Sequence, residues 1–262
     1  MPARDEGERI RPVLDRLFAS VRRPAEVLVV VDTISDRTAG VLAAYGAAEP
    51  RLTCLVSSYG AGPASAIRYG MDRASAPVIV VTMADGSDDA RQIDELAALI
   101  EDGAVVAAAS RYAPGGRQVG GPALKRALSR LAGTTLQALT RPGTSDATNS
   151  FKAYSAEFVR SVGVESGQGF AVGIELTAKA RRLRLPVAEI PTTWRERQAG
   201  RSGFRLIRWL PAYLRWYLFC FGRPLTAAQV TGAQVTGAPV TGAQLTGAQI
   251  AAARTTGGAA GA

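Results

Sequence analysis

The sequence contains no histidine and only two cysteines, Cys54 and Cys220, among its 262 residues. Without histidine, Ser-His-Asp and Cys-His nucleophiles and the common zinc sites are excluded. Two cysteines are too few for a disulfide framework. General acid–base chemistry would therefore depend on carboxylates, or the reaction would need no base.

Long apolar runs are also lacking. No stretch of about 18 uninterrupted apolar residues occurs, and the N-terminus has no charged-then-apolar signal pattern. These absences predict a cytoplasmic protein without a membrane-spanning helix. Hydrophobic residues still make up 47% of the chain, enough for a sizeable core.

The positive charge is concentrated in one segment. Residues 1–180 carry 20 Lys+Arg and 20 Asp+Glu, whereas residues 181–223 carry ten Arg against two Glu. Such local basicity predicts a phosphate-bearing or membrane-surface partner, and no nucleic-acid partner. From Thr226 the chain repeats every five residues (TAAQV, TGAQV, TGAPV, TGAQL, TGAQI), so residues 224–262 are predicted to be a disordered, low-complexity tail.

The remaining residues alternate β-branched runs with amphipathic ones, which predicts an α/β fold with a mostly parallel sheet flanked by helices. The predicted strands are Val27–Val31, Leu52–Val56, Val78–Val81, Ala104–Ala108, Asn149–Tyr154 and Val187–Ile190. The predicted helices are Asp36–Tyr45, Pro63–Ala74, Ala90–Ile100, Pro122–Thr140 and Gly169–Arg182. Ligands of such sheets bind beyond the carboxyl ends of the strands, so the loops at Asp32, Ser57, Asp85 and Ser110 should share one rim.

The loop after the third strand carries the strongest chemical signal. It reads Thr-Met-Ala-Asp-Gly-Ser-Asp-Asp over residues 82–89, with three carboxylates in five residues. Hard oxygen ligands of this kind suit Mg²⁺ or Mn²⁺, and Asp85, Ser87 and Asp88 are the candidate metal ligands. The alternative is that Asp88 and Asp89 cap the following helix. For Gly60-Ala-Gly62 ordinary turn chemistry is favoured over phosphate binding, and Asp32 is either a ribose or base acceptor or a turn residue.

An ordered set of motifs over residues 2–222 resembles glycosyltransferase family 2, with the GT-A fold, and within it the dolichyl-phosphate mannosyltransferase or polyprenyl-phosphate sugar synthase branch. The matching text is Pro2 to Glu6, Val31-Asp32 with Ser35 and Asp36, Gly60 and Gly62, Ala84-Asp85, Ser110 to Tyr112, Lys125-Arg126 with Ser129-Arg130, Asp146 to Phe151, Gly169 with Glu175, and Glu189 through Arg197.

The resemblance implies roles for individual residues. Pro2, Arg4, Glu6, Val31 and Asp32 would line the nucleotide base and ribose, and Ala84 and Asp85 would lie at the metal and diphosphate. Arg111 and Arg197 would contact the donor phosphates and, with Asp85, form the catalytic set. Lys125, Arg126, Ser129 and Arg130 would face the lipid phosphate of the acceptor, although a solvated helix face would also carry such cations.

The sequence departs from the family pattern at several points. Met83 stands where the first carboxylate of D-x-D belongs, and Thr33 replaces an Asp. The apolar strand that normally precedes Pro2 is absent, so either the start of the gene is misplaced or the sheet lacks its first strand.

Residues 204–223 form a second unit after the predicted catalytic domain, 1–203. Residues 204–221 hold seven of the 17 aromatics, and Arg205, Arg208 and Arg215 fall on one side of a helical projection. Docking on the inner face of the cell membrane and packing on the protein's own core are both compatible with this pattern, and Pro211 is expected to divide the segment.

The favoured function is transfer of a hexose, with inversion, from a nucleotide sugar of the GDP-mannose or UDP-glucose class to polyprenyl phosphate. A phosphate monoester is already an anion near neutral pH, so it needs no base. A family 2 transferase with a glycan or small-molecule acceptor is the second possibility. A catalytically silent lipid-surface binding protein is the third.

Overall fold

The structure is a computed structural model, and it describes residues 1–121, 123–196, 206–226 and 229. The strands are β1 (Pro2–Ala3), β2 (Val27–Val31), β3 (Leu52–Val56), β4 (Val78–Val81), β5 (Val106–Ser110), β6 (Arg117–Val119), β7 (Lys152–Ser155), β8 (Val187–Pro191) and β9 (Thr193–Arg195). The α-helices are α1 (Arg11–Ser20), α2 (Arg37–Gly46), α3 (Pro63–Arg73), α4 (Ile93–Glu101), α5 (Ala123–Thr140), α6 (Ala156–Val162), α7 (Val172–Arg182) and α8 (Leu206–Phe219). Short 3₁₀ turns, η1 (Gly7–Ile10) and η2 (Ala90–Gln92), precede α1 and α4.

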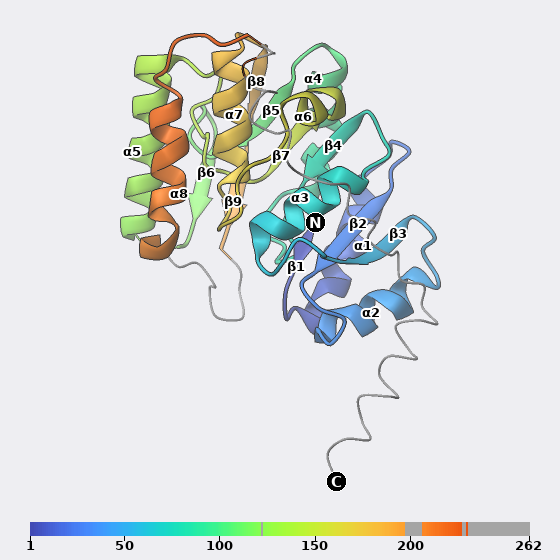
Figure 1. Cartoon of the computed structure of the whole chain (residues 1–262). Coiled ribbons are helices and arrows are strands. Elements are labelled where there is room, and N and C mark those ends of the chain that lie inside the picture. The colour runs from blue at the N-terminus through green and yellow to red at the C-terminus, as the bar shows by residue number, and fades with distance from the viewer. Residues whose placement is uncertain (122, 197–205, 227–228, 230–262) are drawn as a thin grey trace.

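The strands form two main sheets and a small pair (Figure 1). One sheet has the order β1-β2-β3 and is parallel throughout. The other has the order β4-β7-β5-β8, in which β7 runs antiparallel to both neighbours and β5 pairs with β8 in parallel. The prediction of a mostly parallel sheet is confirmed. Three predicted strands have the observed bounds, and the fourth begins two residues later than predicted, at Val106.

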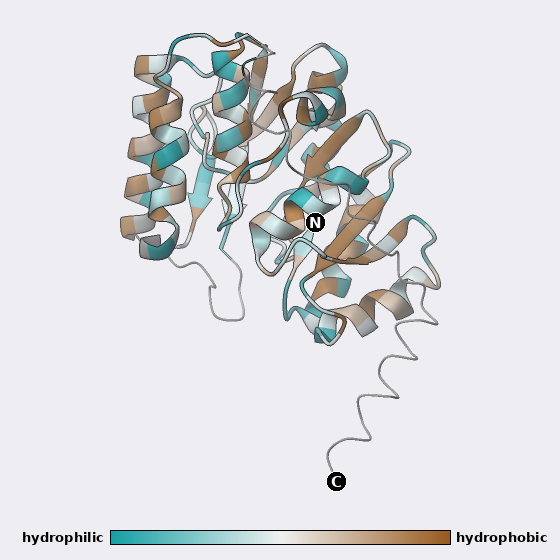
Figure 2. Ribbon diagram, in the orientation of Figure 1, coloured by the Kyte–Doolittle hydropathy of each residue, from teal (hydrophilic) through white to brown (hydrophobic). Residues whose placement is uncertain are grey.

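Apolar side chains alternate along β2 and β4, so each strand contacts helices on both faces. Val27 and Val29 pack with residues of α1 and α2, and Val78 and Val80 pack with residues of α4. On the opposite face, Val30 of β2 and Ile79 and Val81 of β4 pack against residues of α3. Figure 2 shows β2 and β4 as continuous hydrophobic ribbons, as expected for strands covered on both faces.

The first strand of the parallel sheet, β1, is present but short. Pro2 and Ala3 pair in parallel with Val30 and Val31, so the sheet does not lack its first strand, but β1 is only two residues long.

Helices α5, α7 and α8 lie on the side of the molecule away from β2 and β3, with α5 and α8 side by side (Figure 1). The hydroxyls of Thr135 on α5 and Tyr217 on α8 lie 2.8 Å apart. Trp216 of α8 is 2% exposed and packs in a cluster with Leu136 and residues of α7. The expectation that Pro211 divides this segment is wrong, because α8 continues through it.

Within the described residues, no helix is long and apolar enough to cross a membrane. Most of the predicted tail, 224–262, and the junction at 203 lie outside those residues. The domain boundaries therefore stay predictions.

Candidate active site

Asp32 joins two of the predicted rim loops. It follows β2, and its Oδ1 accepts the N–H of Gly62 at 2.9 Å. Gly62 has φ +112°, a left-handed value that favours glycine, and it is the N-cap of α3. Arg4, whose side chain is 72% exposed, lies 3.9 Å from the other Asp32 oxygen. The two candidate donor residues Arg4 and Asp32 are thus brought together at the carboxyl ends of β1 and β2.

The segment after β1 is fastened to the start of α2. Asp36 caps α2 by accepting the N–H of Thr38, and its second oxygen accepts the N–H of Asp5. The Thr38 hydroxyl oxygen accepts the N–H groups of Glu6 and Gly7. These bonds hold the backbone that follows β1 against the start of α2.

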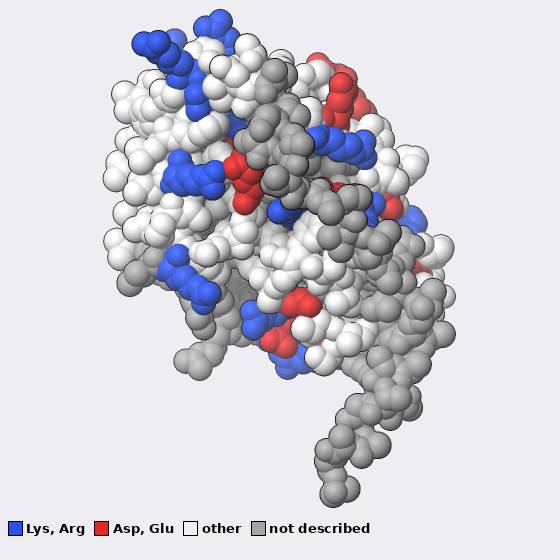
Figure 3. Space-filling view, in the orientation of Figure 1, with Lys and Arg blue, Asp and Glu red and all other residues white. Residues whose placement is uncertain are grey.

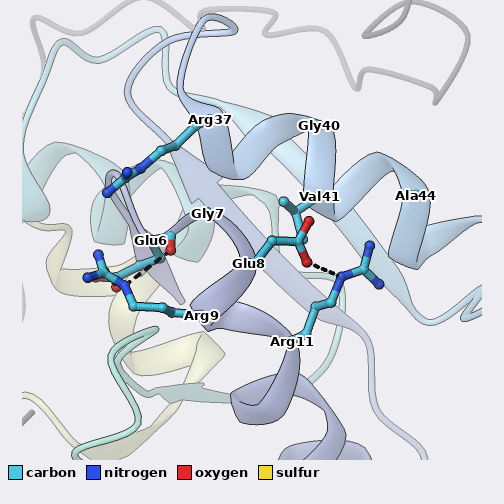
Figure 4. A pocket seen from close by; sticks show the side chains of 9 residues that line it. All are labelled: Glu6, Gly7, Glu8, Arg9, Arg11, Arg37, Gly40, Val41 and Ala44. Carbon is cyan, nitrogen blue, oxygen red and sulfur yellow. Dashed lines mark hydrogen bonds and ion pairs between the residues drawn. The ribbon is translucent and has the colours of Figure 1, made fainter. Parts of the chain in front are cut away.

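A surface hollow of about 580 Å³ lies beside this segment, between η1 and α2 (Figure 4). Arg9 points to Glu6 at 3.6 Å, and Arg11 points to Glu8 at 2.5 Å. Arg37 donates two N–H groups to the Asp5 carbonyl. Glu6, a candidate donor residue, is 7% exposed and is part of these contacts, so its observed role is to hold the segment after β1.

The other candidate donor residues are less accessible. Val31 is fully buried and Ala84 is 4% exposed, both in the core cluster under β2. Their side chains therefore offer no surface to a ligand, and any contact would use the backbone. Pro2 is half-buried in β1.

The three carboxylates of the acidic loop after β4 make different contacts. Asp85 Oδ1 accepts the N–H of Ser87, and Asp89 caps η2 by accepting the N–H of Arg91. Asp88 instead accepts the Met83 N–H at 2.9 Å and the Thr82 hydroxyl at 3.1 Å. Burial raises the pKa of Asp88 to about 7.

Asp88 stays a predicted metal ligand, but one of its oxygens is already engaged. Its Oδ2 accepts both the Met83 N–H and the Thr82 hydroxyl, so this oxygen is turned toward the end of its own strand. The helix-capping alternative holds for Asp89 but not for Asp88. The described residues contain no group of three or more His, Cys, Asp and Glu able to hold a metal ion. The residues present fit a cation that takes Asp85 from the protein and its other ligands from a diphosphate and water.

Across the sheet, Arg111 and Asp146 form a buried ion pair. The Arg111 Nε donates to Asp146 Oδ2 at 2.7 Å and its Nη2 to Oδ1 at 2.8 Å, while the two side chains are 8% and 0% exposed. Burial lowers the pKa of Arg111 and raises that of Asp146, but the mutual attraction and hydrogen bonds outweigh it. The net pKa of Arg111 is therefore raised and that of Asp146 lowered, and both groups are ionised.

The candidate acceptor helix meets this ion pair through one residue. Arg111 Nη2 donates to the Ser129 hydroxyl of α5 at 3.1 Å, and Ser129 in turn lies 2.7 Å from the Thr148 hydroxyl. Arg126 and Arg130 are exposed and lie three residues before and one after Ser129. The structure therefore joins Arg111 to one of the predicted acceptor residues, Ser129, and the exposed Arg126 and Arg130 flank it on α5. The side chain of Lys125 and all of Arg197 lie outside the described part of the structure.

Two residues to which sequence reasoning gave no role support this region. Lys152 of β7 is fully buried and donates to the carbonyls of Asp146, Ala147 and Asn149. Glu189 of β8 accepts from the backbone and hydroxyl of Ser145. A lysine inside the apolar run of β7 was the available signal, because a buried amine needs partners.

Arg195 was also missed. It ends β9, and its N–H donates to the Ser87 carbonyl at 3.2 Å. Its charge contributes to the lowered pKa of Asp89, after the Arg91 hydrogen bond. The chain thus carries basic residues back to the acidic loop just before Arg197.

The acidic loop after β4 suits a cation, and the exposed arginines of α5 flank Ser129, which bonds to Arg111. Both features are compatible with a group-transfer enzyme for phosphorylated substrates. The chain belongs to glycosyl transferase family 2, whose family profile matches residues 1–163. The prediction of a glycosyltransferase is confirmed.

Relatives of known function agree with this assignment. The chain is 29% identical over 208 residues to polyprenol monophosphomannose synthase of Mycolicibacterium smegmatis, covering 77% of this chain and 78% of that one. It is 27% identical over 208 residues to undecaprenyl-phosphate mannosyltransferase of Micrococcus luteus, covering 77% and 84%. Both names fall within the branch that the motifs resemble.

Solved structures confirm the GT-A fold prediction. Glucosyl-3-phosphoglycerate synthase of Mycobacterium tuberculosis, in complex with Mn²⁺, uridine diphosphate and glucosyl-3-phosphoglycerate, superposes with a TM-score of 0.57 at 18% identity, covering 92% of this chain and 81% of that one. A mannosyltransferase from Pyrobaculum calidifontis, in complex with GDP-Man and Mn²⁺, gives 0.53 at 17% identity, covering 98% and 78%.

Proposed function

We propose that the protein transfers a hexose from a nucleoside-diphosphate sugar to a polyprenyl phosphate at a membrane surface, with inversion and with a divalent cation. The observation that carries the proposal is the hydrogen bond between Arg111 and Ser129, because it joins the predicted donor-phosphate residue to the predicted acceptor helix. The two relatives named above support the lipid phosphate as acceptor.

The reaction needs no protein base. A phosphate oxygen of the acceptor forms a bond to the anomeric carbon, while the bond from that carbon to the diphosphate breaks and its electrons pass to the departing oxygen. Asp85 would hold a cation that neutralises this leaving group. The Asp146 carboxylate is engaged by Arg111 and by the backbone N–H groups of Arg111 and Asn149, which suits a positioning role better than proton removal.

A membrane surface as partner is supported by the exposed apolar residues of α5 and α8. Large hydrophobic side chains that are at least 40% exposed occur on α5 (Leu124, Leu128, Leu131, Leu139), on α8 (Leu210, Leu214, Leu218) and at Phe221. At about 100° per residue, the four leucines of α5 share one stripe, and Arg126, Ser129 and Arg130 lie on the other side of the helix. In Figure 3, Lys and Arg side chains border this side of the molecule. Exposed leucines on two neighbouring helices, with cations on the same side of the molecule, suit the surface of an anionic bilayer.

The packing alternative for α8 also has support, because Trp216 and Cys220 are buried on the protein's own core. One helix can serve both purposes since its leucines lie on a different face. Vesicle flotation with and without anionic lipid tests the docking. Leu131→Asp and Leu214→Asp should each reduce binding to vesicles. Arg160→Ala, at an exposed position on α6 away from this face, is the control and should bind as the parent does.

The transfer itself is tested with purified protein, Mn²⁺ or Mg²⁺, labelled GDP-mannose or UDP-glucose, and a short polyprenyl phosphate. Lipid-linked hexose is the expected product. The free polyprenol, which has a hydroxyl in place of the phosphate, should give none. Turnover only with 3-phosphoglycerate or with a glycan would support a small-molecule or glycan acceptor instead, and lipid binding without turnover under any condition would support a silent binding protein.

A further inference from the structure

Helix α5 has a glycine in its interior at the point where it meets the loop that carries Asp146. Gly133 is a buried residue of this 18-residue helix. A Cβ atom at this position would lie under 3.0 Å from the carbonyl oxygen of Ser145 and 3.5 Å from the ring of Tyr112. Glycine is less favourable than alanine in a helix interior, so its presence here indicates a need for close packing.

The contact of Gly133 lies beside the buried ion pair. Ser145 directly precedes Asp146, which pairs with Arg111. Ser129, one turn before Gly133 on α5, accepts a hydrogen bond from Arg111 at 3.1 Å. Residues four positions apart share one face of a helix, so Ser129 and Gly133 are both part of the surface with which α5 meets the ion pair.

The loop beneath Gly133 is held in place. Glu189 of β8 accepts the Ser145 N–H at 2.8 Å and the Ser145 hydroxyl at 3.0 Å, and it also accepts the Thr144 hydroxyl at 3.0 Å. The Ser145 hydroxyl lies 2.8 Å from that of Ser110 on β5. The Ser145 carbonyl therefore belongs to a backbone that is fastened to two strands, and it resists displacement.

The opposite side of α5 faces outward. The four leucines of its outer stripe are at least 40% exposed. A larger side chain at position 133 would therefore push α5 outward by about 1 Å or more, because ordinary contacts begin near 3.4 Å. Such a shift would draw Ser129 away from Arg111.

We propose that Gly133 is a positioning residue for the transfer: it lets α5 lie against Ser145 and so sets the distance between the acceptor phosphate on α5 and the sugar held near Arg111. This inference rests on the proposed function. The cations of α5 move with the helix, so an outward shift leaves the phosphate bound but misplaced. Misplacement of a reacting group by about 1 Å lowers the rate by about 100-fold. Gly133 therefore acts on kcat, whereas Arg126 and Arg130 act on KM.

A matched pair of glycine substitutions tests this role. A Cβ atom at Gly46, at the end of α2, would meet the carbonyl oxygen of Leu52 at 3.4 Å, which is an ordinary contact. With nucleotide sugar and polyprenyl phosphate, Gly133→Ala should lower kcat about 100-fold and change both KM values by less than about threefold. Gly46→Ala should match the parent. An undiminished kcat in Gly133→Ala, or a loss that lies entirely in the acceptor KM, would overturn the proposal.

Hydrogen exchange measures the position of α5 without any substrate. The N–H groups of Arg111 and Asn149 both donate to the Asp146 carboxylate. Their exchange should be about tenfold or more faster in Gly133→Ala than in the parent, and unchanged in Gly46→Ala. If the parent transfers no hexose to the lipid phosphate, the proposed function fails and this exchange alone decides whether Gly133 holds α5 in place. Unchanged exchange in Gly133→Ala would contradict the inference.

A second variant decides if Gly133→Ala does not fold. Ser129→Ala adds no atom, but it removes the hydrogen bonds that join α5 to Arg111 and Thr148. It should lower kcat about tenfold and leave KM for the nucleotide sugar unchanged. A rise in the acceptor KM with an unchanged kcat would show that transfer does not depend on the position of α5, and the proposal would then be wrong.

Discussion

The two halves of the molecule differ in the sign of their net charge and in what their charged side chains contact. Residues 1–110 carry 11 Lys+Arg and 16 Asp+Glu, whereas residues 111–223 carry 19 and 6. In the acidic half, carboxylates such as those of Asp32, Asp36 and Asp88 accept hydrogen bonds from backbone N–H groups. The basic half builds a side-chain network around Arg111 and Asp146. An acidic rim can hold a diphosphate only through a cation, while a basic helix can hold a phosphate directly. Under the proposed function the acidic loop would hold the donor through a cation, α5 of the basic half would hold the acceptor, and Arg111 would meet the donor phosphates between them.

The largest expected effect concerns the buried ion pair of the basic half. Asp146→Asn leaves Arg111 buried without a countercharge, so the free energy of unfolding should fall by about 3–5 kcal/mol. Urea denaturation measures it. Glu101→Gln, which breaks an exposed pair with Arg23, is the control and should cost less than about 1 kcal/mol. Similar losses for the two variants would contradict the picture of a buried charge centre.

The second prediction separates the carboxylates of the acidic half. Asp85→Asn should lower the rate of hexose transfer by about 100-fold, because it removes the protein ligand of the cation. Asp89→Asn, in the same loop, keeps an N-cap side chain for η2 and removes only the exposed ion pair with Arg91, so transfer should stay within a few-fold of the parent. Chelation with EDTA should abolish transfer in the parent, and added Mn²⁺ should restore it. Undiminished transfer by Asp85→Asn would refute the cation role.

A smaller effect is expected on the acceptor side. Replacing Arg126 and Arg130 together by alanine should raise KM for polyprenyl phosphate about tenfold and leave KM for the nucleotide sugar unchanged. Arg160→Ala on α6 is the matched control for the loss of an exposed arginine. An equal rise in both KM values would show that the two halves do not divide the substrates.

The smallest expected effect is a pH dependence from Lys152. Burial lowers its pKa to about 7, below that of an unfolded lysine. Above pH 7 the unfolded chain then binds the additional proton, so the free energy of unfolding should rise between about pH 7 and 9.5, by at most about 1.4 kcal/mol per pH unit. Three carbonyl acceptors favour the charged amine and keep the slope well under that ceiling. Lys152→Met should remove the rise, and a parent and variant with the same slope would contradict the assignment.

The strands, the main helices and the rim could be predicted because they follow from local patterns. Val27–Val31 and Leu52–Val56 are continuous apolar runs that end in polar turns, and both have their predicted bounds. Helix α1 was not predicted, although its apolar residues Val13, Leu14, Leu17 and Phe18 recur at helical spacing, because the segment is short and begins with a proline-containing turn. The direction of β7 was not predictable, since strand orientation depends on which edge is free when the sheet forms.

Residue type and spacing were sufficient to determine the absence of histidine chemistry, the acidic loop, the cationic helix and the family. Tertiary structure decided which of those residues meet. Ser129 accepts a hydrogen bond from Arg111, which lies 18 positions earlier in the chain. Asp88 accepts from the backbone at the end of its own strand, and Lys152 donates to three carbonyls. A sequence records the groups that can ionise or donate, but burial and the placement of partners set their charge and direction, and both depend on segments distant in the chain.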